Sequence, residues 1–188
     1  MTAIDIHHHY VPQAIVAEAK HHGGTLGVDV SQDRDGTFGF SFNGGSRYPL
    51  LQGLTEVEPR LAMMERGKIS LAALDPSTQL LGYDLQGDQA ESWCRVYNQC
   101  VKGFLRSYPD RFTAMAAVPI QEPARAAKVL EHAVTQLDFR GAYLGTDFPY
   151  ILGDWQCVDK VEALPCAETE KQMILQGNAR KLLKIAAT

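Results

Sequence analysis

The sequence contains no run of about 20 apolar residues, the length that a membrane-spanning helix needs. Its first residues, MTAIDIHHHYVP, have neither the basic nor the apolar region of a secretory signal, so we expect a cytoplasmic protein without a membrane partner. The four cysteines show no CxxC spacing, which argues against a disulfide framework or a zinc knuckle. With 18 basic and 22 acidic residues, the chain also lacks the positive charge typical of nucleic-acid binding.

The composition is that of one ordinary globular domain. The chain has 188 residues, and 45% of them are hydrophobic, a fraction that excludes disorder as the dominant state. Domains usually span about 100–200 residues, and no internal repeat, low-complexity tract or linker divides this chain. We therefore treat residues 1–188 as a single domain.

Strand and helix patterns alternate along the sequence. The opening AIDIHHH has the alternating apolar pattern of a buried strand, and its last residues are histidines. Further strands are expected at Lys68–Leu74, Phe112–Val118 and Gly141–Leu144, and helices at Ala14–Lys20, Glu58–Arg66, Asp88–Tyr108 and Glu122–Leu137. This order indicates βαβ units and a parallel sheet, and therefore an α/β fold.

Two regions depart from this alternation. Runs with strand character on either side of the turn-forming DRDG predict a small inserted β-hairpin over about residues 25–42. The C-terminal part contains three short helical runs, at about residues 154–162, 167–175 and 179–185.

The histidines at the end of the first strand are the first candidate for a functional site. Side chains two residues apart in a strand share a face, so His7 and His9 can converge while His8 points the other way. Two neutral imidazoles form half of a divalent metal site, for which zinc is the usual choice. A polar strand end without a ligand is the alternative interpretation.

Two further residues are candidates. Asp147 follows the apolar AYL in GTDFPY, where a carboxylate at a strand end can act as a third ligand or as a general base, although such a segment is also typical of a turn. Arg47, after Gly-Gly-Ser, can bind a substrate carboxylate or simply be solvated. His21 and His22 are assigned to helix capping, and His132 to a helix surface.

Several segments in order resemble a known family. They are IDIHHHYVP at the start, LGYDL and RVYNQCVKGFLRSYPDRFTAMAAVPIQEP in the middle, and GTDFPYILGDWQCVDKVEAL with ILQGNARKLLKI at the end. Together they resemble the amidohydrolase-related superfamily, and within it the branch of aminocarboxymuconate semialdehyde decarboxylase and related aromatic-acid decarboxylases.

The resemblance implies a (β/α)8 barrel with one divalent metal, usually zinc, and the nonoxidative decarboxylation of an unsaturated or aromatic carboxylic acid. It assigns His7 and His9 as metal ligands on the first strand. Asp147 becomes the ligand on the last strand that also handles the proton, and Arg47 a binder of the substrate carboxylate. A metal-dependent hydrolase of a lactone or cyclic amide would use the same site, and remains an alternative.

The chain departs from the family pattern in its middle. The family has a metal-binding histidine on the fifth strand and another histidine beyond it, and none of the six histidines here occupies such a position. A (β/α)8 barrel takes about 250 residues, and the segment that looks like the fourth strand runs directly into the one that looks like the eighth, near residues 144–147. We therefore expect an incomplete barrel with about the first four strands and the last. Such a chain is expected to be unstable, to aggregate, or to form a homodimer that covers its open edges. We favour a non-catalytic remnant over an active decarboxylase, which would need a third nitrogen ligand from His21, His22 or a second subunit.

Overall fold

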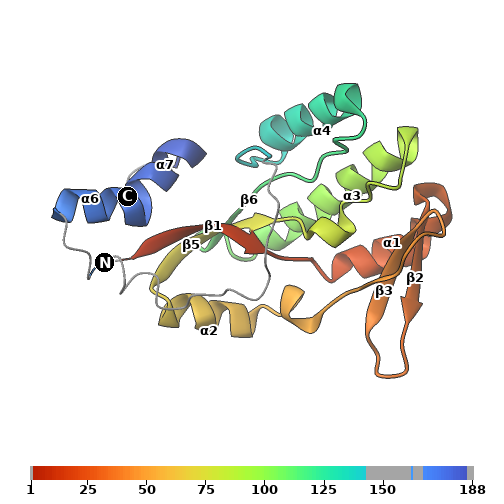
Figure 1. The fold of residues 1–188 in the computed structure, drawn as a ribbon, viewed down its shortest axis with the longest axis horizontal. Helices are drawn as coiled ribbons and strands as arrows, with labels where there is room; N and C mark the ends of the chain where they lie inside the picture. The colour runs from red at the N-terminus through yellow and green to blue at the C-terminus, as the bar shows by residue number, and fades with distance from the viewer. Residues whose placement is uncertain (1, 143–161, 163–166, 186–188) are drawn as a thin grey trace.

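A parallel sheet forms the centre of the computed structural model, which describes residues 2–142, 162 and 167–185 (Figure 1). Its strands are β1 (Ala3–His9), β5 (Ile69–Asp75) and β6 (Phe112–Ala114), in the order β1-β5-β6. Both pairings are parallel. The three strands lie where the apolar runs of the sequence predict them, although β6 is shorter than the expected Phe112–Val118.

The chain returns to the sheet after the last long helix. Arg140 N donates to Ala114 O at 2.9 Å, and Ala116 N donates to Gly141 O at 2.7 Å, so residues 140–141 lie beside β6. Residues 141–142, the first half of the predicted fourth strand Gly141–Leu144, lie at the expected edge of the sheet but are not assigned to a strand, and the last two residues are outside the described part of the chain.

Four helices connect the strands and pack on the sheet. They are α1 (Ala14–Leu26), α2 (Glu58–Arg66), α3 (Gly87–Leu105) and α4 (Pro123–Gln136). Their apolar residues join those of the sheet in one large core, in which Trp93, Tyr97 and Val129 are fully buried. Short 3-10 turns, η1 (Gln52–Leu54) and η2 (Thr78–Leu80), lie in the connections.

Two helix ends differ from the sequence prediction. Helix α1 runs through Gly23 and Gly24 and ends at Leu26, and the C-cap Gly27 has a φ of 68°, the left-handed conformation that glycine favours. The prediction that His21 and His22 cap the end of this helix is therefore wrong. Gly67 does follow α2, but its φ is −82°, and the left-handed residue is Lys68, with φ 54°.

The predicted hairpin is present and carries a third strand. β2 (Val28–Gln32) pairs antiparallel with β3 (Phe38–Phe42), which also pairs with the two-residue β4 (Tyr48–Pro49). Phe40 and Phe42 are buried in the large core. The insertion is therefore anchored to the core, whereas the sequence suggested only a surface hairpin.

The C-terminal helices contact a different part of the sheet. α6 (Glu168–Gln172), the π-helical turn η3 (Met173–Gly177) and α7 (Asn178–Leu183) lie apart from α1 to α4, toward the start of β1 (Figure 1). Ala179 and Ile185 pack against a second, small apolar cluster formed by Ile4, Ala73 and Met115. Leu175 of η3, by contrast, belongs to the large core. Because Ala72 and Leu74 belong to the large core and Ala73 to the small one, the two clusters occupy opposite faces of the sheet.

No helix within the described ranges is long and apolar enough to cross a membrane.

Candidate metal site at the carboxyl end of β1

An extra residue in β1 sets the direction of the histidines. Asp5 pairs with Ala72 and His8 with Leu74, so three residue steps in β1 correspond to two in β5. Strict alternation from Ile4, which packs against Ala73, would place His8 on the face of the small cluster. The extra residue forms a β-bulge, after which the side chains alternate in the opposite sense. His7, rather than His8, therefore lies on the face of the small cluster.

His7 and His9 lie side by side. Their ring centroids are 4.7 Å apart in an edge-to-face arrangement. His7 Nδ1 lies 3.1 Å from Asp75 Oδ2, and His9 Nδ1 lies 3.2 Å from the carbonyl oxygen of Pro76. An oxygen acceptor at Nδ1 favours the tautomer with the proton on Nδ1, which leaves the lone pair of each ring on Nε2. Such a pair of imidazoles suits a divalent metal ion bound through Nε2.

Asp75 is a member of this site that the sequence reasoning missed. It is the last residue of β5, is 4% exposed, and pairs in register with His9. Its carboxylate also accepts a hydrogen bond from the backbone N of His8 at 3.0 Å. Its place in the sequence could have indicated it, because Asp75 directly follows an apolar strand and precedes a proline. The carboxyl ends of parallel strands meet at the same edge of the sheet, where His7 and His9 also lie.

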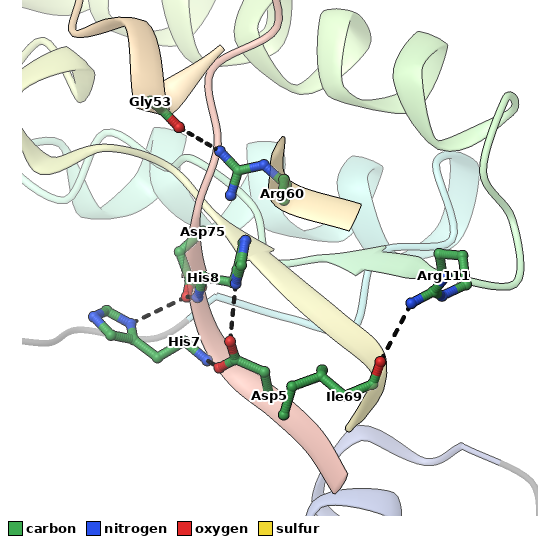
Figure 2. Close-up of polar contacts among 8 residues, drawn as sticks. All are labelled: Asp5, His7, His8, Gly53, Arg60, Ile69, Asp75 and Arg111. Carbon is green, nitrogen blue, oxygen red and sulfur yellow. Dashed lines mark hydrogen bonds and ion pairs between the residues drawn. The ribbon is translucent and has the colours of Figure 1, made fainter. Parts of the chain in front are cut away.

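His8 lies on the opposite side of β1 from His7 (Figure 2). It is 7% exposed, and its Nδ1 lies 2.8 Å from Asp5 Oδ2. Within the described part of the chain, its buried Nε2 has no hydrogen-bond partner. His8 pairs in register with Leu74 of the large core, so it lies on the helix-covered side and faces away from His7 and His9, as their i, i+2 spacing predicted.

Arg60 and Tyr10 are buried near the same strand end. The Arg60 guanidinium donates to the carbonyl oxygen of Gly53 (Figure 2). It also donates to the carbonyl oxygen of Leu54 and lies 5.1 Å from the centre of the Tyr10 ring. Burial lowers the pKa of Arg60 and raises that of Tyr10 to about 12, although the charge of Arg60 acts on Tyr10 in the opposite direction. Arg60 thus links the 3-10 turn η1, which precedes α2, to Tyr10, the residue that follows the three histidines.

The described residues provide two proposed ligands but not a complete site. Among them, no group of three or more His, Cys, Asp or Glu side chains is arranged to hold a metal ion. Asp147, the expected third ligand, lies outside the described residues. The imidazole pair fits half of a divalent site, and its completion by Asp147 stays a prediction.

Arg47 lies on the three-stranded insertion, just before β4. Its guanidinium contacts Ser31 Oγ at 2.8 Å, Thr37 O at 3.2 Å and Asp33 Oδ2 at 2.9 Å. It also covers Gly39 so closely that a Cβ atom there would overlap it. These contacts give Arg47 a role in holding the hairpin together, and binding of a substrate carboxylate stays a prediction.

The other histidines lie on helices. His21 and His22 are exposed on α1, with ring centroids 4.4 Å apart, and His22 lies 3.9 Å from Glu18. His132 is partly buried on α4.

Comparison with known proteins identifies the fold. No protein-family model matches the sequence. A dihydroxybenzoic acid decarboxylase from Polaromonas, solved with manganese and the inhibitor 2-nitroresorcinol, matches with a TM-score of 0.53 and 21% identity over 75% of this chain and 37% of its own. The 5-carboxyvanillate decarboxylase of Sphingomonas paucimobilis matches with a TM-score of 0.51 and 18% identity over 79% of this chain and 45% of its own.

A protein from Staphylococcus aureus that is proposed to be an amidohydrolase matches over a longer part of the chain. The match covers 93% of this chain and 55% of that protein, with a TM-score of 0.50 and 18% identity. The chain shares its fold with part of the (β/α)8 barrels of these proteins.

The expected fold class, an incomplete barrel of this type, is thereby confirmed. The partial barrel spans 37–55% of the length of these three solved proteins. In a complete (β/α)8 barrel, active sites lie at the carboxyl ends of the strands. His7, His9 and Asp75 occupy that edge of the partial barrel.

Proposed function

We propose that the chain derives from a metal-dependent, nonoxidative carboxy-lyase of the amidohydrolase-related superfamily, in the branch of aminocarboxymuconate semialdehyde decarboxylase. The observation that carries the proposal is the His7 and His9 pair, with both Nδ1 atoms next to oxygen acceptors at the carboxyl end of a barrel strand. The fold likeness to several decarboxylases, one of them solved with manganese, supports it.

In this proposal His7 and His9 bind one divalent metal ion through Nε2, and Asp147 is the third ligand. When bound, the metal would act as a Lewis acid toward an oxygen of a small unsaturated or aromatic carboxylic acid. Asp147 would hold the proton that is delivered to the substrate carbon from which carbon dioxide leaves. Arg47 is retained as a candidate for the substrate carboxylate only if it can leave its hairpin partners.

The proposal also includes an internal deletion near residues 144–147. An eight-stranded barrel surrounds its substrate with loops from all its strands, and this chain spans at most 55% of the two decarboxylases and the amidohydrolase-like protein that it matches. We therefore propose that the shortened chain retains metal binding but does not release carbon dioxide from such acids. Dimerisation is a further part of the proposal, since among the described strands β1 pairs only with β5.

Metal titration tests the site directly. Calorimetry with Zn²⁺ and with Mn²⁺ should show one bound ion for each chain, and His7→Ala, His9→Ala and Asp147→Ala should each abolish stoichiometric binding. His22→Ala, which removes an exposed imidazole from α1, is the matched control and should bind as the unaltered protein does. Unaltered binding by both His7→Ala and His9→Ala would refute the ligand assignment.

A second assay tests the reaction. Release of carbon dioxide from a panel of aromatic and muconate-type acids should not exceed the metal-free background for this chain. Turnover that depends on His7 would show that the shortened form is an active enzyme. Hydrolysis of lactones or cyclic amides by the same preparation would favour the alternative activity that the amidohydrolase-like neighbour suggests.

A further inference from the structure

The Asp75 carboxylate lies where it can fix the orientation of the His7 ring. Strands β1 and β5 are parallel and in register at His9 and Asp75, so the carboxylate meets the histidines at one edge of the sheet. One oxygen, Oδ2, lies 3.1 Å from His7 Nδ1 and 3.0 Å from the backbone N of His8. The backbone oxygen of Asp75 accepts a hydrogen bond from Tyr10 N at 3.2 Å. Asp75 therefore contacts the first histidine of the pair, the residue between the two histidines and the residue that follows them.

These contacts are those of a residue that orients a ligand rather than of a ligand itself. No described group of three candidate ligands, Asp75 included, is arranged around a common point. Its carboxylate instead lies at Nδ1 of His7, the ring nitrogen opposite the one proposed to bind the metal. A buried carboxylate is stable only when it accepts hydrogen bonds, and here the accepted bonds come from the strand that carries the histidines.

The next residue extends this arrangement to His9. Pro76 O lies 3.2 Å from His9 Nδ1, so two consecutive residues at the end of β5 contact the two imidazoles. Each contact favours the Nδ1–H tautomer and restricts rotation of the ring. Of these two acceptors, only that of Asp75 is a side chain, so only it can be removed by substitution.

We propose that Asp75 is a positioning residue, which holds the His7 ring with its proton on Nδ1 so that Nε2 is presented to a divalent metal ion. This inference rests on the proposed function, because it assumes that His7 is a ligand. Loss of such an orienting partner typically lowers metal affinity about 10–100-fold.

The test compares two isosteric substitutions on neighbouring strands. Asp75→Asn removes the carboxylate beside His7 Nδ1. The matched control Asp5→Asn removes the carboxylate beside the buried His8, while its amide oxygen can still accept the hydrogen bond from the backbone N of His7. In Zn²⁺ titrations of the folded protein, Asp75→Asn should weaken binding about 10–100-fold, and Asp5→Asn should change it much less. Equal effects of the two substitutions would overturn the proposal.

A second readout needs no metal. Nitrogen-15 NMR of the metal-free protein should show His7 in the Nδ1–H tautomer, and Asp75→Asn should convert it to a mixture while leaving His9 unchanged. An unchanged His7 signal overturns the role of Asp75 even if the unaltered protein binds no metal, an outcome that would separately refute the proposed function. If Asp75→Asn does not fold, Asp75→Ser, with its small neutral hydroxyl, is expected to give the same results and is judged by the same criteria.

Discussion

The two faces of the β1-β5-β6 sheet differ in how they are covered. On one face, α1 to α4 and the three-stranded insertion, with Leu175 of η3, form a continuous core in which Trp93 and Tyr97 are fully buried. On the other, Ile4, Ala73 and Met115 form a small cluster that Ala179 and Ile185 cover. In a complete barrel this second face is filled by side chains from all eight strands.

The face that contains most of the apolar core is therefore not the face that carries the candidate metal site. The helix-covered face is built from elements that follow one another in the sequence, and their apolar residues form one large cluster. The other face of the sheet, which would line the inside of a complete barrel, carries His7 and His9 at the carboxyl end of β1. Among the described residues, it is covered mainly by the C-terminal helices. We therefore expect substitutions on the helix-covered face to affect the free energy of unfolding more than substitutions on the inner face.

Trp93→Ala should have the largest effect. The side chain is fully buried, its Nε1 donates to Leu80 O at 2.7 Å, and its ring contacts those of Phe42 and Phe40. Loss of such a residue typically costs about 3–5 kcal/mol, measurable by urea unfolding followed by circular dichroism. Tyr83→Ala, at a side chain that is 45% exposed, is the control and should cost much less. A loss below about 1 kcal/mol for Trp93→Ala would contradict the importance of this core.

Asn98→Ala should follow in size. The Asn98 amide donates to Ala117 O at 2.9 Å and accepts from Ala117 N at 2.8 Å, and the residue is 1% exposed. Removing it leaves two buried backbone groups without partners, at a cost of about 2–3 kcal/mol in the same unfolding assay. Gln99→Ala, at the exposed next position of α3, should leave the unfolding free energy nearly unchanged.

Ile4→Ala and Leu74→Ala compare the two faces directly. Both residues lie in the sheet and are buried, but Leu74 belongs to the large core and Ile4 to the small cluster. The cost of such truncations ranges over about 2–5 kcal/mol, and we expect Leu74→Ala near the upper end and Ile4→Ala near the lower end. Equal losses in urea unfolding would show that the C-terminal helices complete the inner face as fully as α1 to α4 complete the other.

The smallest effect near neutral pH concerns the α3 cysteines. Burial raises the pKa of Cys94 from 9.0 to about 12 and that of Cys100 to about 11. The folded protein thus holds these protons more tightly than the unfolded chain, so their contribution to stability is fully present below about pH 8 and is lost as the pH rises toward 11–12. The urea concentration at the midpoint of unfolding should decrease as the pH is raised above about 9. This decrease should be smaller in Cys94→Ala.

Alkylation checks the same pair independently. Because few thiolates form at pH 8 when the pKa is so high, iodoacetamide should modify Cys94 and Cys100 slowly in the folded protein and rapidly in urea, as read by peptide mass spectrometry. Rapid modification of Cys94 in the folded state would show that the helix-covered core opens more readily than its packing suggests.

Local patterns in the sequence were sufficient for most of the fold. The apolar alternation of AIDI and the run ISLAAL predicted strands that are present, and the repeat of Trp93, Tyr97 and Val101 predicted the buried side of α3. Helix ends were less accurate, because the two glycines in α1 looked like a terminus although packing continues the helix to Leu26. The third strand of the insertion was missed, since two residues carry too little periodicity.

The candidate site was predictable only in part. The i, i+2 spacing correctly indicated that His7 and His9 lie together. The acceptor of His7, however, is 68 residues away at the end of another strand, and no local pattern relates the two positions. The contacts of Arg47 with the hairpin likewise depend on pairing between strands.

Residue order alone thus defines the alternating helices and strands, the histidines at a strand end and a length too short for eight strands, because these follow from local periodicity and counting. The parallel register of β1 and β5, the extra residue that turns His7 rather than His8 toward Asp75, and the covering of Ile4 by the C-terminal helices arise from packing between distant segments. Such contacts depend on the geometry of the whole sheet, which no local stretch of the chain encodes.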